Sequence, residues 1–190
     1  IQAGINGAEE GDTVLVAAGT YIENIVWAAT NGIKLIGSGE DDCFIDGDSL
    51  ASVIRFEADL SGIIDSTTLI TGFTIQNGYA QGGGSNSRGG GMYLIGADPT
   101  LTDLTFSGNL VAEWVGNSSG LGGGMFLQHS SPTLTGVTFS GNSAPGVGGG
   151  GMFLQNYCNP TLKNVTFIGN SAEHGGGMNL GSFCDPTLKN

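Results

Sequence analysis

The sequence predicts an all-β protein, a parallel β-solenoid with three short strands in each turn of the coil. A Gly-Gly-Gly-Met block occurs four times and contains every methionine of the chain, namely Met92, Met125, Met152 and Met178. Pro-Thr-Leu follows seven or eight residues after each methionine, and Phe-x-Gly-Asn follows the first three of these prolines. A repeat of 26 to 33 residues with three short apolar segments is typical of a coil whose turns bury their apolar faces against one another.

The composition supports a folded core and excludes several classes of protein. The chain has 190 residues, 36 of them glycine, and a formal net charge of −12. The glycines do not indicate a disordered linker, because 39% of the residues are hydrophobic. Five basic residues cannot neutralise a row of phosphates, which excludes nucleic acid as a partner. Since no apolar stretch approaches the roughly 18 residues of a membrane-spanning helix, we expect no membrane insertion by this segment.

The chain divides into a cap, irregular turns and regular turns. Residues 1–12 are the expected N-terminal cap, because the apolar residues at positions 1, 5 and 8 suit one short helix that covers the open end of the coil. Residues 13–88 form irregular turns, with strands expected at Thr13–Val16, Ile22–Trp27, Ile33–Gly37, Cys43–Asp46, Ser52–Phe56 and Leu69–Asn77. We interpret Phe73 to Asn77 as a Phe-x-Gly-Asn block with one residue too many.

Residues 89–190 are the regular turns, in which equivalent residues should stack ~4.8 Å apart in columns. The alternation predicts Leu134, Val137 and Phe139 pointing inward, with a bend at Gly136. The glycine triplets suit tight corners where a side chain would collide with the next turn. The sequence stops in mid-repeat at Asn190, so we expect residues 1–190 to be a single solenoid domain within a longer chain.

One column consists of Asn109, Asn142 and Asn170, which close the three Phe-x-Gly-Asn blocks. An amide side chain both donates and accepts hydrogen bonds, and asparagine tolerates the left-handed backbone of a turn. We therefore expect a structural ladder of asparagines along the coil.

A second column consists of Tyr93, Phe126 and Phe153, the residues directly after the first three methionines. If it points outward, it forms an exposed aromatic stripe that could bind sugar faces or another protein. The alternative is a stripe covered by a loop, for which residues 110–121 with Trp114 are the candidate. The sequence leaves both alternatives open.

Carboxylates crowd the segment that holds Asp41, Asp42, Asp46 and Asp48. Oxygen ligands at this density could hold Ca²⁺, the one cofactor that the sequence raises. The spacing is not that of an EF-hand loop, and Asp-Gly pairs are also ordinary turn chemistry.

Two cysteines, Cys158 and Cys184, each lie two residues before the proline of their repeat. They therefore occupy adjacent turns at a Cα separation of ~4.8 Å, which is within disulfide range. A disulfide and a stacked pair of free thiols are both open, and Cys43 has no evident partner.

No catalytic arrangement is legible in the sequence. The basic residues are few and scattered, and His129 and His174 lie in expected loops without matched partners. Asp41 and Asp42 are an adjacent acidic pair with another aspartate nearby, and they too lie in an expected loop.

These motifs resemble known families. The first 25 residues resemble the start of many pectate-lyase-like right-handed parallel β-helix proteins. The repeat resembles that of the polymorphic outer-membrane proteins, in which GGA-plus-aliphatic and FxxN tetrapeptides alternate; Gly90-Gly91-Met92 and Phe106–Asn109 carry the match, with GGGM in place of GGAI. The resemblance implies a right-handed parallel β-helix on a secreted or surface-anchored bacterial protein, often an adhesive one.

The sequence and the resemblance together predict a non-enzymatic structural or adhesive β-solenoid outside the cell or on its surface. Its partners would be other protein subunits or surface glycans, and open solenoid ends would favour homo-oligomers or filaments. The alternative is a β-helix that binds or degrades carbohydrate.

Overall fold

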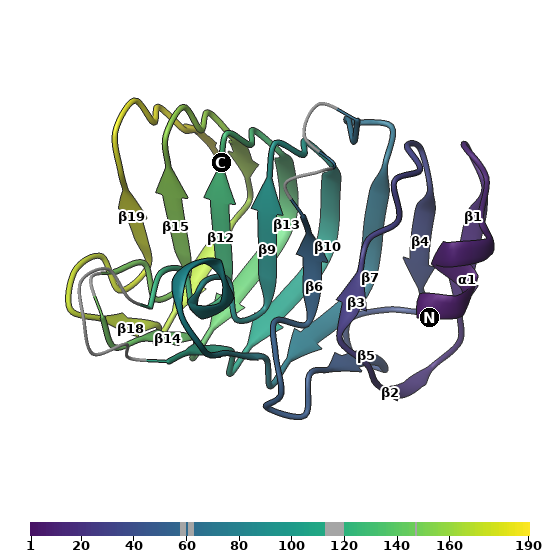
Figure 1. Cartoon of the computed structure of the whole chain (residues 1–190), viewed down its shortest axis with the longest axis horizontal. Helices are drawn as coiled ribbons and strands as arrows, with labels where there is room; N and C mark the ends of the chain where they lie inside the picture. The colour runs from purple at the N-terminus through teal and green to yellow at the C-terminus, as the bar shows by residue number, and fades with distance from the viewer. Residues whose placement is uncertain (58–59, 61–62, 113–119, 147) are drawn as a thin grey trace.

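The computed structural model describes residues 1–57, 60, 63–112, 120–146 and 148–190. A short helix is followed by a coil of short strands that pair in parallel with the strands of the next turn (Figure 1). The strands lie in three sheets, which confirms the all-β solenoid with three strands in each turn. No helix in these residues is long and apolar enough to cross a lipid bilayer.

We name the three sheets A, B and C. Sheet A contains β1 (Thr13–Val16), β2 (Gly19–Ile22), β4 (Lys34–Gly37), β5 (Cys43–Asp46), β7 (Leu69–Gln76), β10 (Thr100–Ser107), β13 (Thr133–Ser140), β16 (Thr161–Lys163), β17 (Thr166–Ile168) and β20 (Thr187–Lys189). Sheet B contains β3 (Ile25–Val26), β6 (Ile54–Phe56), β9 (Met92–Ile95), β12 (Met125–Gln128), β15 (Met152–Gln155) and β19 (Met178–Leu180). Sheet C contains β8 (Tyr79–Ala80), β11 (Leu110–Val111), β14 (Ser143–Ala144) and β18 (Ser171–Ala172).

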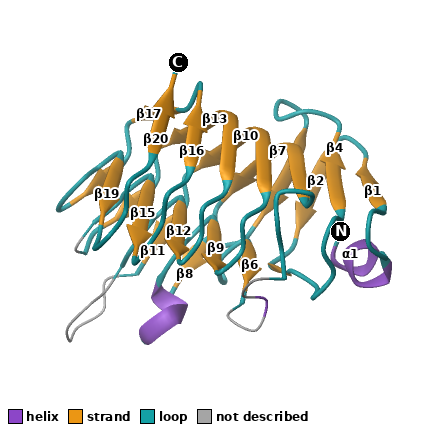
Figure 2. Cartoon of the chain, turned by 90° about the horizontal axis from the view of Figure 1, so that it is seen from above, coloured by secondary structure: helices purple, strands orange, loops and turns teal. Residues whose placement is uncertain are grey.

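Helix α1 (Gln2–Gly7) caps the N-terminal end of the coil, as the apolar spacing predicts (Figure 2). Its residue Ile5 is fully buried, and Ile1 and Ala8 pack against the same core. A single turn of 3₁₀ helix, η2 (Gly84–Ser87), lies between β8 and β9. The expected strand at Ile22–Trp27 is wrong in its bounds, because Ile22 is the last residue of β2 and only Ile25 and Val26 form β3.

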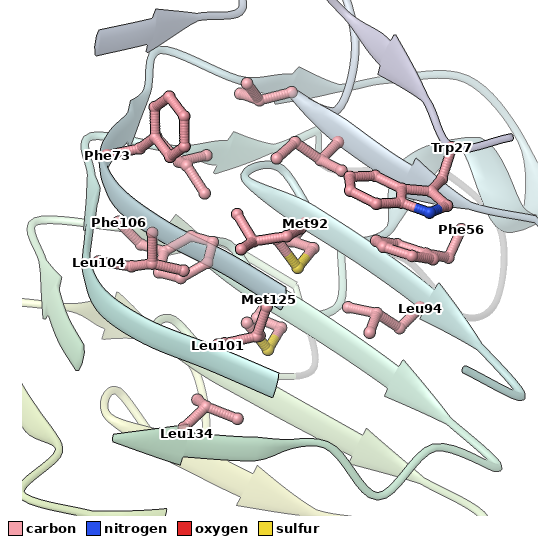
Figure 3. Packing of buried hydrophobic residues seen from close by; sticks show 14 of the residues in the cluster. Trp27, Phe56, Phe73, Met92, Leu94, Leu101, Leu104, Phe106, Met125 and Leu134 are labelled. Atoms are coloured by element: carbon pink, nitrogen blue, oxygen red, sulfur yellow. The ribbon is translucent and has the colours of Figure 1, made fainter. Parts of the chain in front are cut away.

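The expected columns of the regular turns are confirmed. Met92 pairs with Met125, Met125 with Met152, and Met152 with Met178. The Leu101 and Phe106 columns stack in the same register, and the side chains of the first three methionines are buried. Figure 3 shows this packing for Met92, Met125, Leu101, Leu104 and Phe106. Each such side chain stabilises the fold by about 1.5–3 kcal/mol, so the core holds successive turns in one register.

The glycine triplets form the corners that lead into sheet B. The first glycine of each triplet has a left-handed backbone, with φ of +62° at Gly89 and +68° at Gly122. Gly123 is the second glycine of the triplet that begins at Gly122, and a Cβ on it would lie 2.6 Å from the carbonyl oxygens of Gly150 and Ser143. Only glycine lets neighbouring backbones approach this closely.

The interpretation of Phe73 to Asn77 as a stretched Phe-x-Gly-Asn block is wrong. In β7, Phe73 pairs with Leu104 and Ile75 pairs with Phe106. Asn77, with φ of +53°, therefore takes the place of the turn glycine, and Gly78 takes the place of Asn109. The sequence pattern misleads here because the phenylalanine belongs to the neighbouring core position.

Candidate functional site

The asparagine ladder is confirmed, and it is structural. Asn109 Nδ2 donates to Asn142 Oδ1 at 3.0 Å, and Asn142 Nδ2 donates to Asn170 Oδ1 at 2.9 Å. The same oxygens accept the backbone N–H of the preceding asparagine, so buried polar groups are satisfied from turn to turn. The left-handed residue is the glycine before each asparagine, with φ of +61° at Gly108, and not the asparagine as its turn propensity suggests.

The column of Tyr93, Phe126 and Phe153 stacks as expected but does not form an exposed stripe. The three residues are 1%, 0% and 8% exposed. The Arg55 guanidinium lies 4.0 Å from the centre of the Tyr93 ring, and Arg88 lies over Phe126. Leu121 packs against the same rings. Leu121 is the last residue of the covering loop expected at residues 110–121, whereas residues 113–119, with Trp114, lie outside the described residues.

The four aspartates of the calcium hypothesis are not gathered at one point. No group of three or more acidic, histidine or cysteine side chains that could hold a metal occurs in the described part of the chain. Asp46 instead accepts hydrogen bonds from the side-chain amides of Gln76 and Asn77 and from the N–H of Asp48. Partial burial raises the pKa of Asp46, but these hydrogen bonds outweigh it and hold the pKa below its ordinary value.

Asp41 and Asp42 line an acidic groove of about 560 Å³ that also contains Glu40 and Asp103. The groove exists because β4 and β5 both pair with the single strand β7. Residues 38–42, which connect β4 to β5, therefore bulge outward at the bend, where later turns have only one residue. Glu40 fixes the bulge by accepting hydrogen bonds from the hydroxyls of Thr74 and Thr105. The sequence could not reveal this groove, since Asp103 lies in β10, which is separated from β4 by the strand β7 that pairs with both.

An exposed aromatic column, which the sequence reasoning missed, lies at the turn between sheets B and A. It consists of His129, Tyr157 and Phe183, which come from three successive turns of the coil. The ring centroids are 5.9 Å apart for the first pair and 4.9 Å for the second, and the planes of Tyr157 and Phe183 differ by 5°. Tyr157 is 59% exposed and Phe183 is 72% exposed. We call these three residues the aromatic column.

The backbone of the aromatic column is strained. His129, Tyr157 and Phe183 have φ of +51°, +56° and +57°, the left-handed region that bulky residues avoid at a cost of about 1–2 kcal/mol each. In the preceding turn Gly96 has a left-handed backbone, with φ of +62°. Strain of this kind is found preferentially at ligand-binding sites.

A second ladder holds these turns in register. The Asp98 carboxylate accepts the N–H of Ser131, the Ser131 hydroxyl accepts the N–H of Asn159, and the Asn159 amide oxygen accepts the N–H of Asp185. These residues directly precede the prolines of the repeat. The aromatic column is therefore carried by turns that are tied to one another by hydrogen bonds.

Cys158 and Cys184 lie in adjacent turns, as their spacing predicts, and both are free thiols in this structure. The Cys158 N–H donates to the Cys184 sulfur at 3.4 Å. Burial raises the pKa of the Cys158 thiol to about 11, so this thiol is neutral at ordinary pH.

Residues 10–190 match the family model of the right-handed β-helix region, so the chain belongs to the right-handed β-helix family. The narrower resemblance to the polymorphic outer-membrane repeat stays an expectation. No curated protein sequence matches the chain.

Two solved structures of pectin methylesterases have a similar fold. One, from Yersinia enterocolitica, has 14% identity and a TM-score of 0.49 over 85% of this chain and 54% of its own. The other, a pectin methylesterase in complex with a hexasaccharide, has 15% identity and a TM-score of 0.51 over 85% of this chain and 50% of its own. The chain thus spans about half the length of these proteins, and at this identity the likeness concerns the fold alone.

Proposed function

We propose that this chain is a carbohydrate-binding β-helix of a secreted or cell-surface protein, with the aromatic column as its binding site. The observation that carries the proposal is the exposure of Tyr157 and Phe183 on a strained, hydrogen-bonded turn. The aromatic stack of Tyr93, Phe126 and Phe153 is buried, whereas the stacked rings of Tyr157 and Phe183 lie largely in solvent.

The geometry of the rings suits a flat, partly apolar ligand. Centroid separations of 4.9 and 5.9 Å between nearly parallel planes mean that the rings are offset, so part of each face stays open. The C–H face of a sugar ring packs against such an aromatic face, while its hydroxyls remain in water. Successive rings rise with the turns of the coil, so an extended chain of sugars can contact more than one of them.

The charge of the protein favours a neutral glycan. A net charge of −12 repels polyuronates and other polyanions. Neutral hexose polymers carry no charge and therefore meet no such repulsion.

Affinity electrophoresis in gels that contain single neutral polysaccharides tests this proposal. We expect retardation of the wild type and its loss in a Tyr157→Asn/Phe183→Asn double variant, because asparagine keeps the left-handed turn but removes the rings. Ile168→Ala, which removes a residue 56% exposed elsewhere on sheet A, is the matched control and should migrate as the wild type. Equal retardation of the double variant and the wild type rejects the proposal.

Glycan hydrolysis in the acidic groove is the second candidate. The observation that favours it is that Glu40 and Asp103 bring carboxylates from separate turns to one groove. Glycoside hydrolysis uses two carboxyl groups, one as the acid and the other as base or nucleophile. Hydrolysis would be supported if the wild type releases reducing ends from a glycan and Asp103→Asn abolishes this release without loss of binding. Hydrolysis is rejected if the wild type releases no reducing ends.

A further inference from the structure

The two cysteines of the last turns lie directly beside the aromatic column. Cys158 follows Tyr157 and Cys184 follows Phe183, so each aromatic residue that points outward is joined to a cysteine that points toward the core. Cys158 is fully buried and Cys184 is partly exposed. A bond between the two sulfurs would therefore link the bases of Tyr157 and Phe183.

The backbone on both sides of the cysteines holds them at disulfide range. Gly181 N–H donates to the Leu154 carbonyl at 2.7 Å, and Asp185 N–H donates to the Cys158 carbonyl at 3.2 Å. Paired parallel segments place equivalent Cα atoms ~4.8 Å apart, and disulfides span Cα separations of about 4.4–6.8 Å.

The present contacts of the sulfurs are weak and can be replaced. The Cys158 thiol donates to the Gln155 carbonyl at 3.3 Å, and the Cys184 thiol donates to the Ser182 carbonyl at 3.5 Å. Thiols are poor hydrogen-bond donors. The loss of these two hydrogen bonds therefore costs little compared with the stability gained from a covalent bond.

We propose that Cys158 and Cys184 are a redox-controlled staple that joins two successive turns of the coil beneath the aromatic column. The oxidant is a low-molecular-weight disulfide such as oxidised glutathione. The Cys184 thiolate attacks the glutathione disulfide, forms a mixed disulfide with one glutathione and releases the other as a thiolate. The Cys158 sulfur then attacks the Cys184 sulfur of the mixed disulfide, loses its proton and releases the second glutathione thiolate. Two protein thiols lose two hydrogens and become one disulfide, and one glutathione disulfide becomes two thiols.

Cys184 makes the first attack because it is the more accessible sulfur. Burial raises the pKa of the Cys158 thiol, which makes this sulfur the poorer first nucleophile. Cys43 is also buried, and its thiol donates to the Ala17 carbonyl in the irregular turns. It belongs to a different turn of the coil and serves as an internal control.

Thiol counting on the full chain tests the staple. After treatment with oxidised glutathione and unfolding in a thiol-free denaturant, we expect the number of titratable thiols to fall from three to one. The intact mass should fall by about 2 Da, the mass of two hydrogens. Cys43→Ser should leave this change intact, whereas Cys158→Ser and Cys184→Ser should each abolish it. Three remaining thiols, a glutathione adduct without closure, or a disulfide-linked dimer would overturn the proposal.

A consequence for ligand binding rests on the proposed function. A staple beneath Tyr157 and Phe183 fixes the spacing of their rings, so the oxidised protein should release a bound glycan more slowly than the reduced protein. Equal release rates overturn this consequence alone. The thiol count needs no glycan, so failure of the staple and failure of the proposed function can be told apart.

Discussion

The rings of Tyr157 and Phe183 stack with their centroids 4.9 Å apart, although the two residues are 26 positions apart in the sequence. The coil brings them together, and the left-handed backbone at each residue turns the ring outward. The same coil places Tyr93 and Phe126 in a stack that is buried. Two aromatic columns thus differ in role because one is covered and the other is not.

Replacement of residues from the two columns should separate these roles. Phe126→Ala should lower the free energy of unfolding by about 3–5 kcal/mol, because it leaves a cavity in a packed stack. Tyr157→Asn should change it by less than about 1 kcal/mol, since relief of backbone strain offsets the lost stacking. Denaturant unfolding measures both; similar costs for the two variants would contradict the assignment.

Removal of one amide from the asparagine ladder should weaken the coil. Asn142→Ala leaves the buried N–H of Asn109 and the carbonyl of Phe106 without their partners. We expect a loss of about 2–4 kcal/mol in the free energy of unfolding, because each orphaned buried group costs about 1–3 kcal/mol. The exposed Asn86 is the control, and Asn86→Ala should stay within about 0.5 kcal/mol of the wild type.

The corner glycines should not tolerate a methyl group. Gly123→Ala places a Cβ 2.6 Å from two carbonyl oxygens of the next turn, and we expect it to cost about 3 kcal/mol or more. Gly7→Ala meets no atom within 4 Å and should be neutral or slightly stabilising. Thermal unfolding of the two variants compares them; an equally stable Gly123→Ala protein would refute the corner geometry.

The Asp46 carboxylate should make the free energy of unfolding depend on pH in the acid range. Its pKa is lowered in the folded state, so the unfolded chain binds the proton more tightly, and stability falls as the pH drops. The contribution should be complete above the unfolded pKa of about 3.9 and disappear as the pH falls through the folded value. Asp46→Asn should remove this part of the acid transition. Identical acid unfolding curves for variant and wild type would rule the contribution out.

Closure of the Cys158–Cys184 disulfide should stabilise the protein. The bond would close a loop of 27 residues, for which the chain-entropy relation gives about 3–4 kcal/mol. Urea unfolding of oxidised and reduced protein should therefore show a higher midpoint for the oxidised form, with Cys184→Ser insensitive to oxidant. A lower midpoint after oxidation would mean that the closed bond strains the turns.

The repeat made much of the fold predictable, because the blocks that contain Met92, Leu101, Phe106 and Asn109 recur in the same order and the register follows from the alignment of the blocks. Burial of Tyr93 and Phe126 was not predictable in the same way. It depends on Arg55, Arg88 and Leu121, which come from segments that do not follow the repeat.

The aromatic column escaped sequence reasoning for a different reason. His129, Tyr157 and Phe183 each lie three residues before the proline of their repeat, but they are three different residue types, and the first regular turn has Gly96 at this position. The groove residue Asp103 is similarly remote from Asp42 in the sequence. A left-handed backbone at a bulky residue, which identifies the column, is visible only in the structure.

Saturation-transfer NMR with a neutral oligosaccharide that binds the protein tests the central claim most directly. Irradiation of the aromatic protons should transfer saturation to the C–H protons on one face of the sugar rings. The Tyr157→Asn/Phe183→Asn variant should lose this transfer, and Ile168→Ala should keep it. Undiminished transfer in the double variant would contradict the assignment of the aromatic column as the carbohydrate-binding site.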